Sequence, residues 1–240
     1  MADQQSRGLG IALQGAVCNR MTTRLCLVDC GIGNIRSIEN AVHFLGCDSY
    51  RGATPDALEH ADAFIFPGVG AFGEAMAALR ERNLVSALES HVLDKRTPYL
   101  GICLGLQLVA RSSSENGHHA GLGWIDASVE QIPRSADAPS LHVGWNTLTR
   151  NGTTPLFEGI NADANFYFDH RYSLLCDPST VLATTPYTEP LVAAIQSDNI
   201  FATQFHPEKS QTNGLRVLRN FLNHVERTVD QPLARCSSNV

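Results

Sequence analysis

The stretch TPYLGICLGLQL, residues 97–108, joins a short apolar run to leucines with helical spacing. This pattern predicts a β-strand over 99–102, a tight turn at Cys103 and a helix that begins at Leu104. The two flanking glycines lack the Cβ atoms that would clash in so sharp a turn. Such a strand–turn–helix is a nucleophile elbow, which lifts its central side chain above the edge of a sheet. We therefore expect Cys103 to be presented to a substrate, with the positive end of the helix favouring its thiolate form.

A second stretch, near the C-terminus, supplies the base that a cysteine nucleophile needs. Residues 200–205 (IFATQF) predict a strand, and His-Pro-Glu follows it directly. Proline biases the preceding residue toward extended backbone, in which side chains two positions apart face the same way. His206 and Glu208 should therefore project together, as a base and the carboxylate that fixes its tautomer. Alone, Cys103 could be a small buried residue and the tripeptide a solvated strand end, but together they favour catalysis.

A third apolar run opens into a glycine-rich loop. Residues 64–73 read FIFPGVGAFG, with three glycines in six residues. Such a loop can turn its backbone N–H groups inward to hold a negative oxygen. A phosphate cradle is the competing interpretation, but the chain lacks the GxxxxGK[ST] pattern, and no GxGxxG follows a first strand in a dinucleotide-binding unit.

Six motifs resemble, in the same order, those of the class I, triad-type glutamine amidotransferases, in particular the glutaminase subunit of imidazole glycerol phosphate synthase. The resemblance runs from about Arg24 to Val225. The motifs are DCGIGN (29–34), PGVG (67–70), GICLGLQ (101–107), HVGWN (142–146), YFDHRY (167–172) and QFHPEKS (204–210). The resemblance implies a flavodoxin-like α/β fold: a central, mostly parallel sheet flanked by helices, with an additional β-rich portion of antiparallel or mixed sheet.

The spacing of apolar residues agrees with an α/β fold. In the first half it predicts strands over 25–28 and 62–66, and helices over 35–45, 74–79 and 84–93. After a polar loop at 112–119, short β-rich runs cover 128–132, 142–148, 165–168, 181–185, 191–195 and 200–205. An amphipathic helix over 213–225 closes the pattern.

Chain length and the two ends suggest one domain. A chain of 240 residues can bury a core that is stable without disulfides. We expect a glutamine amidotransferase domain over 22–227, between a flexible extension over 1–21 and a flexible tail over 228–240. The extension lacks the apolar core of a signal peptide, and Met21 is an alternative start.

Charge and cysteine content restrict the ligands. Acidic residues outnumber basic ones by 24 to 18 and no basic stripe occurs, which argues against nucleic acid. No stretch approaches the ~20 apolar residues of a membrane span. The seven cysteines lack the paired spacing of a zinc site, which fits a reducing cytoplasm. His118 and His119 are adjacent and should point apart, so we predict neither a metal nor a cofactor.

The resemblance also implies a reaction. The Cys103 thiolate attacks the side-chain amide carbon of L-glutamine, and His206, oriented by Glu208, protonates the departing ammonia. Water then hydrolyses the glutamyl thioester. The N–H of Leu104, directly after the nucleophile, is one expected donor to the oxyanion. The resemblance places the other donor in the glycine-rich loop, at Gly68 and Val69.

Substrate contacts are expected on both sides of the elbow. Gln107 lies at i+4 from the nucleophile, so its amide faces the same side and could grip the substrate. A surface glutamine is the alternative. The residues expected to bind glutamine are Gly70, Gln107, His170, Arg171 and Tyr172.

The YFDHRY motif departs from the family pattern. Relatives usually carry an apolar residue where this chain has Asp169, and a small hydroxyl residue where it has Arg171. If the backbone of residues 170–172 binds the α-carboxylate of glutamine, as the resemblance implies, the change of side chain matters little. The two residues could equally form a surface ion pair of small energetic weight.

The product requires a partner, because free ammonia is mostly protonated at neutral pH and would be lost as a nucleophile in water. Nothing outside the amidotransferase region is long enough to form a domain that uses ammonia. The resemblance implies a heterodimer with a (β/α)8-barrel cyclase subunit. An exposed tryptophan with a polar rim suits an interface anchor, although Trp145 could also be a core residue. The resemblance implies an interface that includes Asn34, Trp145, Asn146 and Lys209, in loops beside the triad.

Three other functions stay open at this stage. A paralogous glutaminase could feed ammonia to an amidotransferase that modifies a surface-glycan sugar, with an identical triad. A cysteine peptidase or related hydrolase could use the same elbow, although the motifs around Gln107 and at 142–146 disfavour it. A binding scaffold without activity is the third, and the complete triad argues against it.

Overall fold

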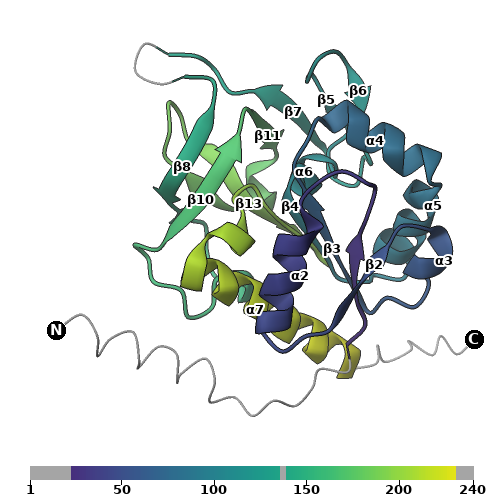
Figure 1. Cartoon of the computed structure of the whole chain (residues 1–240). Coiled ribbons are helices and arrows are strands. Elements are labelled where there is room, and N and C mark those ends of the chain that lie inside the picture. Colours follow the sequence, from purple (N-terminus) through teal and green to yellow (C-terminus); the bar gives the residue numbers. More distant parts are fainter. Residues whose placement is uncertain (1–22, 136–138, 231–240) are drawn as a thin grey trace, which may run out of the picture.

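The structure, a computed structural model, describes residues 23–135 and 139–230. A large sheet lies at its centre, with helices on both faces (Figure 1). The expected extension at 1–21 and most of the expected tail lie outside the described residues. The last helix, α7 (Gln211–Asp230), continues past the expected domain end at 227. The division into a domain and two extensions stays a prediction.

The large sheet is parallel at one end and antiparallel at the other. Its strand order is β2-β1-β3-β4-β14-β13-β12-β9. The first five of these run parallel to one another: β2 (Ser49–Gly52), β1 (Leu25–Val28), β3 (Ala63–Gly68), β4 (Tyr99–Cys103) and β14 (Ile200–Thr203). The remaining three are antiparallel to their neighbours: β13 (Leu191–Ser197), β12 (Val181–Thr185) and β9 (Thr149–Arg150).

Both faces of the parallel portion are buried, as the continuous apolar runs of its strands require. Side chains alternate along β1, so that Leu25 and Leu27 pack on one face and Cys26 and Val28 on the other. The first face is covered by α7 and α2 (Ile35–Phe44). The second is covered by α3 (Pro55–Leu58), α4 (Phe72–Glu81) and α5 (Leu84–Glu89) (Figure 1).

Two smaller sheets form the additional β-rich portion. An antiparallel pair joins β8 (His142–Thr147) to β10 (Asn165–His170). A four-stranded sheet has the order β11 (Tyr172–Cys176), β7 (Ala127–Gln131), β5 (Ser112–Ser113) and β6 (His119–Ala120). This arrangement confirms the predicted fold class, including the mixed portion.

Several elements differ from the sequence-based expectation. Strands β2, β9 and β11 and helix α3 were not predicted; β2 reads SYRG, an edge strand without an apolar run. The expected loop at 112–119 contains β5 and the start of β6, two residues each. The helix expected over 84–93 is α-helical only to Glu89 and continues as a π-helix over Ser90–Asp94. Short elements and edge strands bury few side chains, so their sequences show no periodic apolar pattern.

Candidate active site

The turn at Cys103 has the geometry of a nucleophile elbow. Cys103 ends β4 with φ 51° and ψ −100°, a conformation that costs strain for any residue with a side chain. A Cβ atom on Gly101 would collide with the backbone of Gly105, and one on Gly105 with the carbonyl of Phe66. The buried hydroxyl of Tyr99 donates a 2.9 Å hydrogen bond to the Gly105 carbonyl. The two glycines therefore permit the close approach of backbone to backbone in the turn, as the sequence pattern predicted.

The helix after the elbow is shorter than predicted. Helix α6 covers only Leu104–Gln107. The chain then leaves helical geometry, since the carbonyls of Leu108 and Val109 accept hydrogen bonds from Leu122 and Ile125 instead. A single turn still has free N–H groups at its start, but it lacks the dipole of a long helix.

His206 and Glu208 point together as predicted, although for a different reason. The imidazole Nδ1 lies 2.8 Å from Glu208 Oε1, and the two side chains are 1% and 6% exposed. His206 itself is extended, but Pro207–Lys209 form a 3₁₀ turn rather than a continuing strand. The tight turn, not strand alternation, brings the carboxylate back to the imidazole.

Cys103 and Glu208 both influence the protonation of His206. Burial by itself favours the neutral imidazole, but hydrogen bonding and charge attraction from Cys103 and Glu208 outweigh it and raise the pKa of His206 to about 9. Because Nδ1 is held by Glu208, Nε2 is the atom left for the thiol. It is buried and has no hydrogen bond of ordinary geometry to any described residue. With its pKa raised in this way, the imidazolium is the favoured form at neutral pH.

A cavity of about 230 Å³ opens beside the sulfur. Its lining contains all five residues expected to bind glutamine, and two of the three expected oxyanion residues. Glu115 and Asp169 also line it and were not assigned from the sequence. The Glu115 carboxylate accepts a 2.6 Å hydrogen bond from the Phe72 N–H and so holds the start of α4 against the cavity. The full lining is Val69, Gly70, Cys103, Leu104, Gln107, Glu115, Asp169, His170, Arg171 and Tyr172.

Gly68 brings the glycine-rich loop against the elbow. It ends β3 in register with Cys103. A Cβ atom at this position would collide with the Leu104 side chain. Only glycine lets the backbone of the loop approach the nucleophile this closely. The roles of Gly68, Val69 and Leu104 as oxyanion donors stay a prediction.

Gln107 is buried, and both of its amide hydrogens are used within the protein. Nε2 donates to the Tyr172 carbonyl at 3.1 Å and to Gln204 Oε1 at 3.3 Å. It is therefore not a surface glutamine, and only its carbonyl oxygen remains to contact a substrate. Gln204, which sequence reasoning did not single out, also places its Nε2 3.5 Å from Cys103 Sγ. Its position directly before Phe-His-Pro-Glu was the only available signal.

A chain of neutral side chains runs behind the cavity wall. The Tyr172 carbonyl can only accept, so His170 donates from Nδ1 over 2.9 Å. His170 Nε2 then accepts from His142 Nδ1 at 3.0 Å, and His142 Nε2 accepts from the Asn146 amide at 3.2 Å. Burial lowers the pKa of His142 to about 4 and that of His170 to about 3, so both are uncharged at neutral pH. The motif at 142–146 thus braces the segment that lines the cavity.

Two of the four expected interface residues, Trp145 and Lys209, pack on the ring of Tyr167. Trp145 is 48% exposed and packs edge-on against Tyr167, over whose ring the Lys209 ammonium lies 5.5 Å from the centre. The core alternative for Trp145 is therefore wrong. Asn34 is exposed. Asn146 is only half-buried, with its amide held by His142 and the Pro186 carbonyl.

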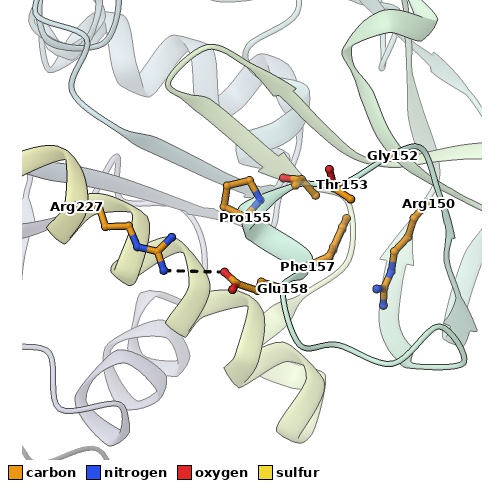
Figure 2. A pocket seen from close by; sticks show the side chains of 8 residues that line it. Arg150, Gly152, Thr153, Pro155, Phe157, Glu158 and Arg227 are labelled. Carbon is orange, nitrogen blue, oxygen red and sulfur yellow. Dashed lines mark ion pairs between the residues drawn. The ribbon is translucent and has the colours of Figure 1, made fainter.

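A more voluminous cavity, of about 410 Å³, lies elsewhere and has no reactive group (Figure 2). Arg150 and Phe157 line it, together with Glu158 and Arg227, whose charged ends are 4.0 Å apart. Two guanidinium nitrogens of Arg150 donate to the carbonyls of Ile160 and Asn161. This cavity contains none of the predicted site residues, and we assign the chemistry to the smaller one because Cys103 lines it.

No group of three or more His, Cys, Asp or Glu side chains that could hold a metal ion occurs in residues 23–135 and 139–230. Within the same ranges, no helix has the length and apolar character needed to cross a membrane.

The fold and the site define a class. The family model described as glutamine amidotransferase class-I matches residues 26–225, and the chain belongs to this family. A solved structure described as a glutamine amidotransferase has a TM-score of 0.67 at 21% identity, covering 84% of this chain and 98% of that one. The structure of PurLQS from Thermotoga maritima has a TM-score of 0.68 at 18% identity, over 85% and 100% of the two chains. At these identities the likeness concerns the fold alone.

Sequence relatives narrow the class. The chain is 42% identical to imidazole glycerol phosphate synthase subunit HisH 2 of Vibrio vulnificus, over 85% of this chain and 95% of the relative. It is 42% identical to the HisH subunit of Aquifex aeolicus, over 85% and 98%, and 46% identical to that of Methanothermobacter thermautotrophicus, over 82% and 97%. Within the class, the chain is a member of this HisH family.

Proposed function

We propose that this chain is the glutaminase subunit of an imidazole glycerol phosphate synthase and supplies ammonia for histidine biosynthesis. The single observation that carries the proposal is the buried Cys103–His206–Glu208 arrangement beside a cavity of about 230 Å³, in a chain whose relatives are named as HisH subunits. The remaining steps follow from the groups at this site.

The nucleophile and base divide the chemistry between them. The Cys103 thiolate forms a bond to the amide carbon of glutamine, and His206, protonated at neutral pH, gives its proton to the leaving ammonia. Glu208 keeps the imidazole oriented and stabilises its charged form. Water activated by His206 then cleaves the thioester to glutamate. The oxyanion of each step is proposed to bind the N–H groups of Leu104 and of the loop at 68–69, each worth on the order of 3 kcal/mol.

The cavity suits the charged end of glutamine. Its wall carries the carboxylates of Glu115 and Asp169, which complement an α-ammonium group. The backbone of residues 170–172 is proposed to bind the α-carboxylate. The structure has no ion pair between Asp169 and Arg171, both exposed, among the described residues, so these side chains are available to solvent or substrate.

The ammonia is proposed to pass to a cyclase subunit that docks over Asn34, Trp145, Asn146 and Lys209. An exposed tryptophan that rests on a second aromatic ring, with a lysine beside it, has the apolar centre and polar rim of an interface. The partner is proposed to be a (β/α)8-barrel.

The test is glutamine turnover by the chain alone, with the barrel cyclase, and with the cyclase plus its nucleotide ligand. We expect turnover to increase at each addition and to be lost in Cys103→Ala, which should still fold. Ammonia release by folded Cys103→Ala would reject the proposed nucleophile. Full-speed turnover that no partner changes would reject the role as a synthase subunit.

A second candidate keeps the chemistry but changes the recipient. Several relatives carry a number in their names, HisH 1 or HisH 2. One such subunit could supply ammonia to an amidotransferase of surface-glycan sugars. Complementation of a histidine auxotroph that lacks its own HisH separates the two, since only a histidine-pathway subunit restores growth.

A further inference from the structure

Gln204 links the nucleophile to the wall of the substrate cavity. It follows β14 directly and its side chain is fully buried. Its amide nitrogen lies 3.5 Å from Cys103 Sγ, and its amide oxygen accepts a hydrogen bond from Gln107. The triad chemistry makes no use of this side chain. A buried amide that touches the reacting sulfur nevertheless changes the environment in which the thiolate forms.

The orientation of the Gln204 amide is determined by the Tyr172 carbonyl, to which it is linked through Gln107 by two hydrogen bonds. The Tyr172 carbonyl can only accept, so Gln107 must turn its NH₂ group toward it. The second hydrogen of the same NH₂ group then points at Gln204, which must present its oxygen. The remaining end of Gln204, its NH₂ group, therefore faces the sulfur. Reversing either amide would oppose two acceptors or two donors in a buried site.

We propose that Gln204 donates a hydrogen bond to the Cys103 thiolate and, through its oxygen, holds Gln107 in place at the cavity wall. The proposal rests on the function proposed above and adds a residue to its reaction. A negative sulfur in a buried site needs donors, and a neutral amide supplies one whose strength does not change with pH. It also leaves His206 free to exchange its proton with substrate, since the thiolate has a second partner.

Other ionisable groups around the sulfur set the background for any pH measurement. His206 faces it from the segment after β14, with Glu208 behind the imidazole. The cavity wall contributes side chains from the loop before β6, the end of β10 and the start of β11. These are Glu115, Asp169, His170, Arg171 and Tyr172. None is altered by the substitutions below, so a change in the profile reports the amide.

The test follows alkylation of Cys103 by iodoacetamide, in which the thiolate sulfur bonds to carbon and displaces iodide. Rates are measured from pH 5 to pH 10 by mass spectrometry of the peptide that contains Cys103, with Cys103→Ala as the blank. Gln204→Glu keeps the shape but replaces the donor by a carboxylate, and Gln204→Met removes the donor without adding charge. We expect alkylation near pH 7 to slow by roughly tenfold or more, with the midpoint of the profile moved to higher pH, further for Gln204→Glu.

A matched control comes from the neighbouring strand. Gln196, on β13, hydrogen-bonds Thr154 and the Asp198 carbonyl and does not contact the sulfur. We expect Gln196→Glu to leave the alkylation profile unchanged. Unchanged profiles in folded Gln204→Glu and Gln204→Met would overturn the proposal, because a merely structural glutamine would affect stability and not the midpoint.

Two further measurements keep the result interpretable. If both Gln204 variants fail to fold, Gln107→Met removes the group that orients the amide; we expect the midpoint to move in the same direction, and an unmoved midpoint overturns the proposal. Glutamine turnover is measured on the same preparations. If the variants turn over glutamine normally and their alkylation profile is unmoved, the hydrogen bond from Gln204 is rejected and the proposed glutaminase function is not. If the alkylation profile depends on Gln204 but the wild type turns over no glutamine, with or without its partner, the proposed glutaminase function is rejected and the hydrogen bond is retained.

Discussion

His206 is the residue whose protonation state decides what the site can do at neutral pH. Its pKa is raised to about 9, so the imidazolium that is proposed to protonate the departing amide nitrogen is already present. The raised pKa depends on Cys103 and Glu208, since burial alone would lower it. In the proposed reaction Glu208 therefore acts through His206 and breaks no bond itself.

The first prediction separates these two roles by substitution. We expect His206→Ala to lose roughly 100-fold or more in glutaminase rate, and Glu208→Gln to retain measurable activity. Because Glu208 stabilises the imidazolium, the alkaline limb of the pH–rate profile should lie near pH 9 in wild type and at lower pH in Glu208→Gln. Steady-state rates with the cyclase present provide the measurement. Equal collapse of both variants would mean that the carboxylate has another role.

The second prediction concerns acid stability and the buried histidines. The folded-state pKa values of His142 and His170, about 4 and about 3, lie below the ordinary value of 6.5. The unfolded chain therefore binds protons below pH 6.5 that the folded chain excludes. The free energy of unfolding should be at its full value above pH 6.5 and fall toward pH 4, by on the order of 2 to 3 kcal/mol per imidazole.

Urea unfolding at pH 7, 5.5 and 4.5 measures this loss. We expect His142→Gln to lose less stability on acidification than wild type, because one of the two buried imidazoles is gone. His118→Gln, at an exposed position, serves as the control and should follow wild type. Identical acid sensitivity in His142→Gln and wild type would show that the chain of neutral histidines does not resist protonation.

At the scale of elements, the elbow depends on backbone packed against backbone. The carbonyl of Phe66, on β3, occupies the place where a side chain at Gly105 would begin. Strand β3 and helix α6 are in this way fixed to each other, and the glycine-rich loop that continues β3 is fixed to the nucleophile. Such contacts cannot relax by rotating a side chain.

The third prediction follows from this contact. Gly105→Ala should lower the free energy of unfolding by about 3 kcal/mol or more, because overpacking against backbone has no flexible neighbour to move. Gly159→Ala is the comparison: its position has φ 67° but open space, so we expect only the cost of left-handed backbone, roughly 1 kcal/mol. Thermal and urea unfolding measure both. A Gly105→Ala variant as stable as Gly159→Ala would contradict the close packing of the elbow.

What could be predicted from sequence depends on how far along the chain each signal extends. The strand through Cys103 and helix α2 have apolar patterns several residues long, and both formed where expected. Strand β11 was not predicted; it pairs with a strand distant in sequence, in a separate small sheet. Gln204 contacts Cys103 only because β14 lies beside β4 in the folded sheet. The pairing of His206 with Glu208 was predicted, but from extended backbone where a 3₁₀ turn exists. Contacts between distant segments leave no periodic trace to read.

At the scale of the whole molecule, strand β8 of the two-stranded sheet carries two accessible apolar side chains. Val143 and Trp145 are exposed, and their spacing of two puts them on the same face of the strand; Leu141, directly before β8, is exposed as well. The hydrogen-bonded chain from Asn146 to Tyr172 starts on this strand and ends at the substrate cavity. A partner bound over Trp145 would thus contact the strand from which this chain of hydrogen bonds starts.

The fourth prediction tests this face. We expect Trp145→Ala to weaken binding of the cyclase by roughly 30-fold, the effect of losing one aromatic anchor. Leu175→Ala removes a side chain that is 54% exposed on a different sheet and should bind the cyclase as wild type does. Isothermal titration with purified cyclase gives both affinities. Equal affinities for wild type and Trp145→Ala would place the interface elsewhere.

The position of β14 also has a consequence for the synthesis of the protein. This strand is inserted between β4 and β13 and brings His206 to a cysteine that precedes it by about a hundred positions in the chain. If His206 is the base, as proposed, a nascent or truncated chain that ends before residue 206 has no base beside the thiol, and we expect it to release no ammonia. We expect catalysis to begin only after the last strand closes the sheet, by which time β8, which carries Trp145, has been synthesised. The order of the chain would in this way keep unfinished molecules from consuming glutamine before they can deliver its nitrogen.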